Sequence, residues 1–116
     1  MNIEYYDSLI GSGWENSFIV KDVFGAWDSE CLTIEKMKDY SFAGCVLDAD
    51  STSKDLESFI LKALEKDVNF IVIDFHLIPN LSKAIRESAD DYLKDNGYID
   101  TKSYEFRLSY FRDNSV

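Results

Sequence analysis

The sequence predicts an α/β fold, with α+β as an alternative, in a single domain over residues 1–116. Residues 68–76 carry apolar side chains on both alternating faces, as a strand covered on both sides must. Before and after it, residues 53–66 and 80–95 carry apolar residues at helical spacing. Together these patterns indicate a mixed sheet of about four to five strands with two main helices.

Length and composition agree with one globular domain. The chain has 116 residues, of which 46% are hydrophobic and 15% are aromatic, so it is too apolar for a disordered polypeptide. We find no internal repeat and no low-complexity tract in the sequence. One hydrophobic core is therefore expected.

The N-terminal part has the weakest periodicity. A short mixed segment runs from Ile3 to Tyr6, and residues 17–24 fit either a strand or one helical turn. We expect a strand over residues 32–36, in preference to a short helix beginning at Ser29. A second strand is expected over residues 42–48, and the two would form a hairpin.

A βαβ unit is predicted in the middle of the chain. Thr52 and Asp55 have the spacing of a capping box, which places a helix start at this point. The helix then carries one apolar stripe, composed of Leu56, Phe59, Ile60, Ala63 and Leu64. Since it joins two strands by tight connections, the strands 42–48 and 68–76 should be parallel.

A second helix and a last strand complete the expected fold. The helix begins at Pro79-Asn80 and stops at Asn96-Gly97. Its buried stripe should contain Leu81, Ala84, Ile85, Ser88, Ala89, Tyr92 and Leu93. The strand 103–111 places aromatic residues and Leu108 on a buried face, and Glu105, Arg107 and Ser109 on a solvent face. Such a strand is expected near a sheet edge.

Charge is the dominant global feature. Twenty-two acidic residues against twelve basic ones give a formal net charge of −10, which repels nucleic acid and anionic membranes and attracts basic surfaces. The cysteines Cys31 and Cys45 form no metal-ligand pattern, and their predicted strand positions do not oppose one another. The N-terminus lacks the features of a signal peptide. We expect a cytoplasmic protein with reduced thiols and without a cofactor.

One group of polar residues lies where ligands often bind in α/β proteins. Asp48 and Asp50 follow one predicted strand, and Asp74 and His76 end the next. If the strands are neighbours, three carboxylates and one imidazole would converge, a donor set suited to Mg²⁺ or Mn²⁺. The competing interpretation is structural: Asp48 and Asp50 precede a helix, where acids complement the dipole, and Asp74 hydrogen-bonds to His76.

Two acidic clusters are candidates for partner binding. One comprises Asp22, Asp28 and Glu30 near Trp27, and the other comprises Glu87, Asp90, Asp91 and Asp95 on the second helix. Like charges four residues apart on a helix are mildly destabilising, so a docking role would explain them. The alternative is a solvated surface that improves solubility.

A short stretch resembles part of a known class of proteins. Residues 24–29, Phe-Gly-Ala-Trp-Asp-Ser, followed by Leu32 and Ile34, resemble the G-x-W-x-S segment before a strand in some small bacterial immunity proteins. Those families continue with Phe-His-Asp, whereas this chain has Glu30-Cys31. As a small acidic domain without catalytic motifs, the chain is also similar to immunity proteins of the barstar-like and contact-dependent growth inhibition classes. The resemblance implies a basic nuclease toxin as partner.

Three functional hypotheses follow from these patterns. The first is an acidic, non-enzymatic inhibitor, an immunity protein that binds and neutralises a cognate basic toxin. The second is a small metal-dependent enzyme or metal-binding regulator that uses Asp48, Asp50, Asp74 and His76. The third is a phage-type acidic decoy that inhibits a nucleic-acid-binding protein.

Overall fold

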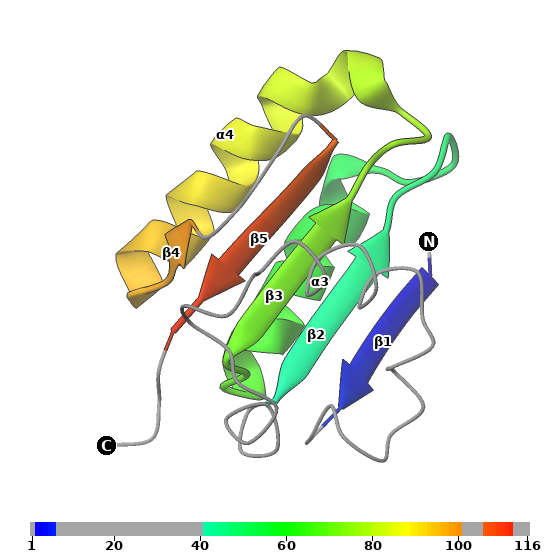
Figure 1. Cartoon of the computed structure of the whole chain (residues 1–116). Helices are drawn as coiled ribbons and strands as arrows, with labels where there is room; N and C mark the ends of the chain where they lie inside the picture. Colours follow the sequence, from blue (N-terminus) through cyan, green and yellow to red (C-terminus); the bar gives the residue numbers. More distant parts are fainter. Residues whose placement is uncertain (1, 7–40, 101–105, 113–116) are drawn as a thin grey trace, which may run out of the picture.

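The fold is organised around a five-stranded mixed sheet, with strands in the order β1-β2-β3-β5-β4 (Figure 1). The computed structural model describes residues 2–6, 41–100 and 106–112. The strands are β1 (Asn2–Tyr6), β2 (Phe42–Val46), β3 (Phe70–Asp74), β4 (Ile99–Asp100) and β5 (Arg107–Phe111). Together with two α-helices, this sheet confirms the predicted α/β class.

Strand β3 lies at the centre of the sheet, as the sequence predicts. It pairs in parallel with β2 and antiparallel with β5, and all five of its residues are buried. Strand β2 in turn pairs with β1 on its other side, in antiparallel orientation. Both edges of β2 are therefore occupied, so the predicted hairpin between residues 32–36 and this strand is wrong. Residues 32–36 themselves lie outside the described residues.

Helix α3 (Ser53–Glu65) connects β2 to β3 and confirms the predicted βαβ unit. The capping box forms as predicted: the Thr52 hydroxyl accepts a hydrogen bond from the Asp55 N–H at 3.2 Å, and the Asp55 carboxylate accepts one from the Thr52 N–H at 2.9 Å. Both groups satisfy donors that the first turn would leave without a partner.

The second helical segment contains α4 (Ser82–Leu93) between two 3₁₀ turns, η2 (Pro79–Leu81) and η3 (Lys94–Asn96). Proline at the first position of η2 and Gly97 after η3, with φ of +84°, delimit it as predicted. The predicted buried stripe is too wide, however. Only Ile85, Ala89 and Leu93 are buried on α4, whereas Leu81, Ala84 and Ser88 are exposed.

Strand β5 differs from the prediction on one face. The predicted solvent face carries Arg107 and Ser109, yet both are buried, at 3% and 0% exposure. The reason lies across the ladder: Arg107 and Ser109 pair with Asp74 and Val72 of β3, which are buried on the same face of the sheet. The expected place near an edge is met, since β5 lies one strand from it. Its partner β4 has two residues, both exposed, and takes the edge of the sheet. Glu105 lies outside the described residues.

Both helices pack on one face of the sheet and form one hydrophobic core with it. Ile71 and Ile73 of β3 and Leu108 and Tyr110 of β5 are the sheet's main contribution to this core. The opposite face is buried as well, and there the Phe70 and Phe111 rings pack with centroids 4.7 Å apart. Burial on both faces of β3 is what its two apolar faces predict.

Candidate functional site

Asp74 ends β3 at the carboxyl edge of the sheet and is 1% exposed. Arg107 pairs directly with it across the β3–β5 ladder. The Arg107 guanidinium donates two hydrogen bonds to one carboxylate oxygen, from Nε at 2.9 Å and from Nη2 at 2.7 Å. The carboxylate charge is thus neutralised by a cation that is itself buried.

The second oxygen of Asp74 is engaged by His76. It accepts a hydrogen bond from the His76 backbone N–H at 3.0 Å and contacts Nδ1 of the same residue. The His76 side chain is 45% exposed, so this network reaches from the buried ion pair to solvent. The predicted Asp74–His76 contact is present, and it belongs to the structural interpretation.

Asp48 has a separate role in the turn that leads into α3. Its carboxylate accepts hydrogen bonds from the Asp50 N–H at 3.0 Å and from the Ser51 hydroxyl at 3.1 Å. Such bonds are typical of an aspartate that shapes a turn before a helix. Within residues 41–100 and 106–112, the structure has no group of three His, Cys, Asp or Glu side chains that could hold a metal. Asp48, Asp50, Asp74 and His76 thus do not form the convergent metal site that the second hypothesis requires.

Cys45 lies on β2 in the core beneath the helices and is a free, fully buried thiol. Burial, together with the negative charge of Asp74, raises the pKa of the Cys45 thiol well above its usual range. A thiol held in its protonated form is a poor nucleophile, so Cys45 acts as a small core residue. Cys31, which the sequence predicts not to oppose Cys45, lies outside the described residues.

The acidic cluster on α4 divides into two kinds of residue. Asp90 is half-buried and serves the fold, since it accepts a hydrogen bond from the Tyr110 hydroxyl and lies 3.4 Å from the Lys94 ammonium group. Burial and the contact with Asp90 raise the pKa of the Tyr110 hydroxyl. The remaining three acids are exposed and spaced four apart, and we call them the acidic ridge: Glu87, Asp91 and Asp95.

The acidic ridge faces solvent as its spacing predicts. If Ile85, Ala89 and Leu93 point into the core, then side chains displaced by about half a turn must point outward. No ion pair to a ridge carboxylate occurs among the described residues. Over the part of the chain that the structure describes, the ridge is therefore a row of exposed negative charge without an ion pair, along the outer side of α4 and η3.

The other predicted acidic patch lies in a different part of the chain. Asp22, Trp27, Asp28 and Glu30 fall outside the described residues, so their arrangement as a docking surface stays a prediction.

No protein-family model, curated protein or solved structure matches this chain. Among the described residues, moreover, no helix has the length and apolar character needed to cross a membrane.

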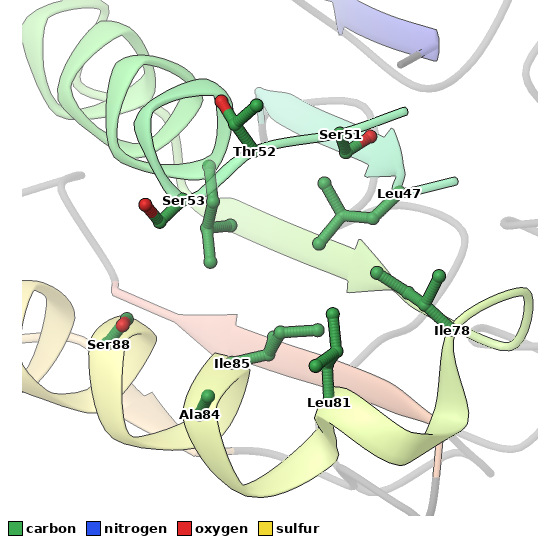
Figure 2. A pocket seen from close by; sticks show the side chains of 10 residues that line it. Leu47, Ser51, Thr52, Ser53, Ile78, Leu81, Ala84, Ile85 and Ser88 are labelled. Atoms are coloured by element: carbon green, nitrogen blue, oxygen red, sulfur yellow. The ribbon is translucent and has the colours of Figure 1, made fainter. Parts of the chain in front are cut away.

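A pocket lies between helices α3 and α4. Its volume is about 230 Å³, and it lies between the start of α3 and the first turns of α4 (Figure 2). We call it the interhelical pocket. Its apolar lining comes from Leu47, Leu56, Ile78, Leu81, Ala84 and Ile85, and its hydroxyl lining comes from Ser51, Thr52, Ser53 and Ser88.

Sequence reasoning missed both this pocket and the role of Arg107. A signal for Arg107 was present, because Asp74 ends a strand buried on both faces and a buried carboxylate needs a cation. Arg107 is the only basic residue within residues 103–111, the strand predicted to complete the sheet. No sequence pattern predicts the pocket, because it depends on how the small residues Ala84 and Ser88 of one helix lie relative to Leu56 of the other.

Proposed function

We propose that this protein is an acidic, non-enzymatic inhibitor: an immunity protein that binds a basic protein toxin, with a nuclease as the expected type, and neutralises it. The observation that carries the proposal is the acidic ridge of Glu87, Asp91 and Asp95, exposed on one side of α4. A row of carboxylates, two on α4 and one on η3, can take the place of nucleic-acid phosphates in the basic active site of a nuclease.

Global charge supports the same proposal. A net charge of −10 accelerates encounter with a cationic partner and disfavours nucleic acid as the ligand. The polar groups at the carboxyl edge of the sheet are engaged with one another, through Arg107, Asp74 and His76, which favours a structural use for them over a catalytic one. We place the activity in the cytoplasm, where the thiol of Cys45 remains reduced.

Reversal of charge on the acidic ridge tests the proposal. Glu87→Lys, Asp91→Lys and Asp95→Lys together add six charge units, which changes the net charge from −10 to −4. Association with the cognate partner, captured from a native host lysate and identified by mass spectrometry, should slow by about tenfold or more at low salt. The melting transition should change little, because the three side chains are exposed.

A matched control separates the ridge from overall charge. Asp50→Lys, Glu65→Lys and Asp100→Lys change the net charge equally at three other exposed positions. If both triple variants associate equally slowly, global charge alone drives binding and the ridge is not the docking surface. An association rate indifferent to salt in the wild type would reject an electrostatic inhibitor altogether.

The identity of the captured protein decides the biological assignment. A toxin nuclease that loses activity upon stoichiometric addition of this protein supports the immunity role. A partner that is a DNA-binding defence protein would instead favour the decoy hypothesis, with the same ridge as the interacting surface.

A further inference from the structure

The interhelical pocket is apolar where it is deepest. Leu56 of α3 and Ile85 of α4 are 5% and 6% exposed, and both line it. Figure 2 shows Leu47 and Ile78 at the end of the pocket next to the strands, with Ser53 and Ser88 facing each other across the two helices. A cavity of about 150 Å³ accommodates benzene, so a volume of about 230 Å³ suits one apolar side chain of a partner.

Leu81 carries the apolar lining of the pocket out to the surface. Leu81 lines the pocket and is 44% exposed, and Leu77, in the turn before η2, is 56% exposed. These are two of the few large apolar side chains that the described surface leaves open to water. An apolar patch that continues into a pocket is typical of a docking site for protein.

The outer lips of the pocket are negatively charged. Glu87 and Asp91 lie three residues after the pocket-lining Ala84 and Ser88, so each is a surface neighbour of the lining on the same side of α4. On the α3 side, Glu57 lies one turn beyond Ser53. Glu57 accepts a hydrogen bond from the Tyr92 hydroxyl, which raises the pKa of that tyrosine and joins the two helices beyond the pocket.

Arg86, one of the two basic residues of α4, is engaged with its own neighbours. The Arg86 guanidinium lies over the Phe75 ring, 5.9 Å from its centroid, and its Nε donates to the Ser82 hydroxyl at 3.3 Å. At the start of α3, the capping box of Thr52 and Asp55 supplies a carboxylate to the positive end of the helix dipole. Asp55, Glu57, Glu87 and Asp91 outnumber the exposed lysines of the same turns, Lys54 and Lys83, so the charge beside the pocket favours a cationic ligand.

Building on the proposed function, we propose that the interhelical pocket receives an apolar anchor side chain from a lysine- or arginine-rich segment of the partner. The anchor, of leucine or phenylalanine size, enters between Leu56 and Ile85. The flanking cations reach the carboxylates of Glu57, Glu87 and Asp91. The pocket supplies the desolvated centre of the interface and the acids supply its charged rim, a division common in protein complexes.

Short blocked peptides test this assignment without the natural partner. The first probe is Lys-Arg-Leu-Phe-Lys-Arg, the second replaces Leu-Phe by Ser-Ser, and the third replaces every base by glutamate. Binding is followed by methyl NMR shifts of Leu56, Ile78 and Ile85 during titration. The first peptide should shift these methyl groups and bind about tenfold or more tightly than either of the other two.

A variant that fills the interhelical pocket is compared with a matched variant at a position outside it. Ser88→Trp places a large side chain in the pocket, whereas Ser58→Trp makes the same change at an exposed position of α3 outside it. Neither substitution changes the net charge of the protein. Ser88→Trp should weaken binding of the first peptide about tenfold, while Ser58→Trp should leave it unchanged, and their melting temperatures report whether each is folded.

The outcomes separate this inference from the proposed function. If the serine peptide binds as tightly as the first peptide, charge alone explains binding and the apolar anchor has no role. If the glutamate peptide binds as tightly as the first peptide, the carboxylates beside the pocket have no role. Either result overturns the inference. Concentration-dependent methyl shifts without peptide would identify a second copy of this chain as the occupant and also overturn it. If Ser88→Trp binds the captured cationic partner as tightly as wild type, the pocket is rejected while the electrostatic inhibitor stands.

Discussion

Replacement of Arg107 by methionine removes the cation that neutralises the buried Asp74 carboxylate. Asp74 is 1% exposed and the Arg107 side chain 4%, so water cannot take the place of the guanidinium. Methionine retains much of the aliphatic length of arginine, while the charge and the two hydrogen bonds to Asp74 at 2.9 and 2.7 Å are lost. What remains is a carboxylate whose only described contacts are with His76.

The expected loss of stability is about 3–5 kcal/mol, the usual cost of breaking a buried ion pair from one side. Against a total stability of about 5–15 kcal/mol, this is a large fraction. Arg112→Met provides the comparison, because Arg112 also pairs with an aspartate, Asp67, which is 66% exposed. Arg112 additionally lies over the Tyr98 ring at 4.5 Å, so its loss should cost about 1–2 kcal/mol.

Urea unfolding followed by circular dichroism measures each variant. The double variant Asp74→Leu with Arg107→Met removes both charges and should recover most of the loss, because an apolar pair needs no compensation. Its difference from the sum of the single variants is the coupling energy of the pair. The reasoning is refuted if Arg107→Met costs less than about 1 kcal/mol, or if the single losses simply add in the double variant.

Three further predictions concern the ends of helices and the effect of pH. Thr52→Ala removes the capping hydroxyl and should lower the free energy of unfolding in urea by about 1 kcal/mol. Thr52→Ser keeps the hydroxyl and should retain most of this stability. Equal losses in the two variants would contradict the capping role. Gly97→Ala should cost about 1–2 kcal/mol because φ at this position is +84°, and not because of crowding, since the atom met by the added Cβ is Arg112 Cδ at 3.4 Å. Gly97→Asn should cost less, because asparagine tolerates a positive φ better than alanine. No loss of stability in Gly97→Ala would show that the turn relaxes. Burial raises the pKa of Tyr98 to about 12 from 10.0, so the folded state holds this proton more tightly than the unfolded state. Its contribution to stability is complete below pH 10 and is lost as the pH rises from 10 to 12, and Tyr98→Phe should show a smaller loss in urea unfolding across that range.

Local patterns were sufficient for the central part of the fold, over residues 42–97. The central strand, the βαβ unit and both helices were predicted because periodicity and caps are encoded over a few neighbouring residues. Helix α3 is the clearest case, since the spacing of Thr52 and Asp55 predicts its start and the two residues form the expected reciprocal hydrogen bonds. Strand β5 was predicted with the wrong exposure, because alternation of polar and apolar residues cannot distinguish a solvent face from a face that buries an ion pair.

The candidate site was predicted less completely. The exposed acids Glu87, Asp91 and Asp95 followed from helical spacing, since the apolar stripe determines which side faces water. Asp90 has the same chemistry but bonds to Tyr110, a partner 20 residues away in sequence. The alternative metal site of Asp48, Asp50, Asp74 and His76 does not form among the described residues. Asp48 instead accepts hydrogen bonds in the turn before α3, and Asp74 accepts them from Arg107.

The sequence by itself determined the class of fold, the central place of β3 and the negative charge, since these depend on composition and on short-range periodicity. Only the tertiary structure decided that Arg107 lies beside Asp74, 33 residues away in sequence, and that α3 and α4 leave a pocket between them. Both features depend on strand order and on how side chains from separate elements fill shared space. These are properties of spatial neighbours, and a one-dimensional pattern does not record which neighbours meet.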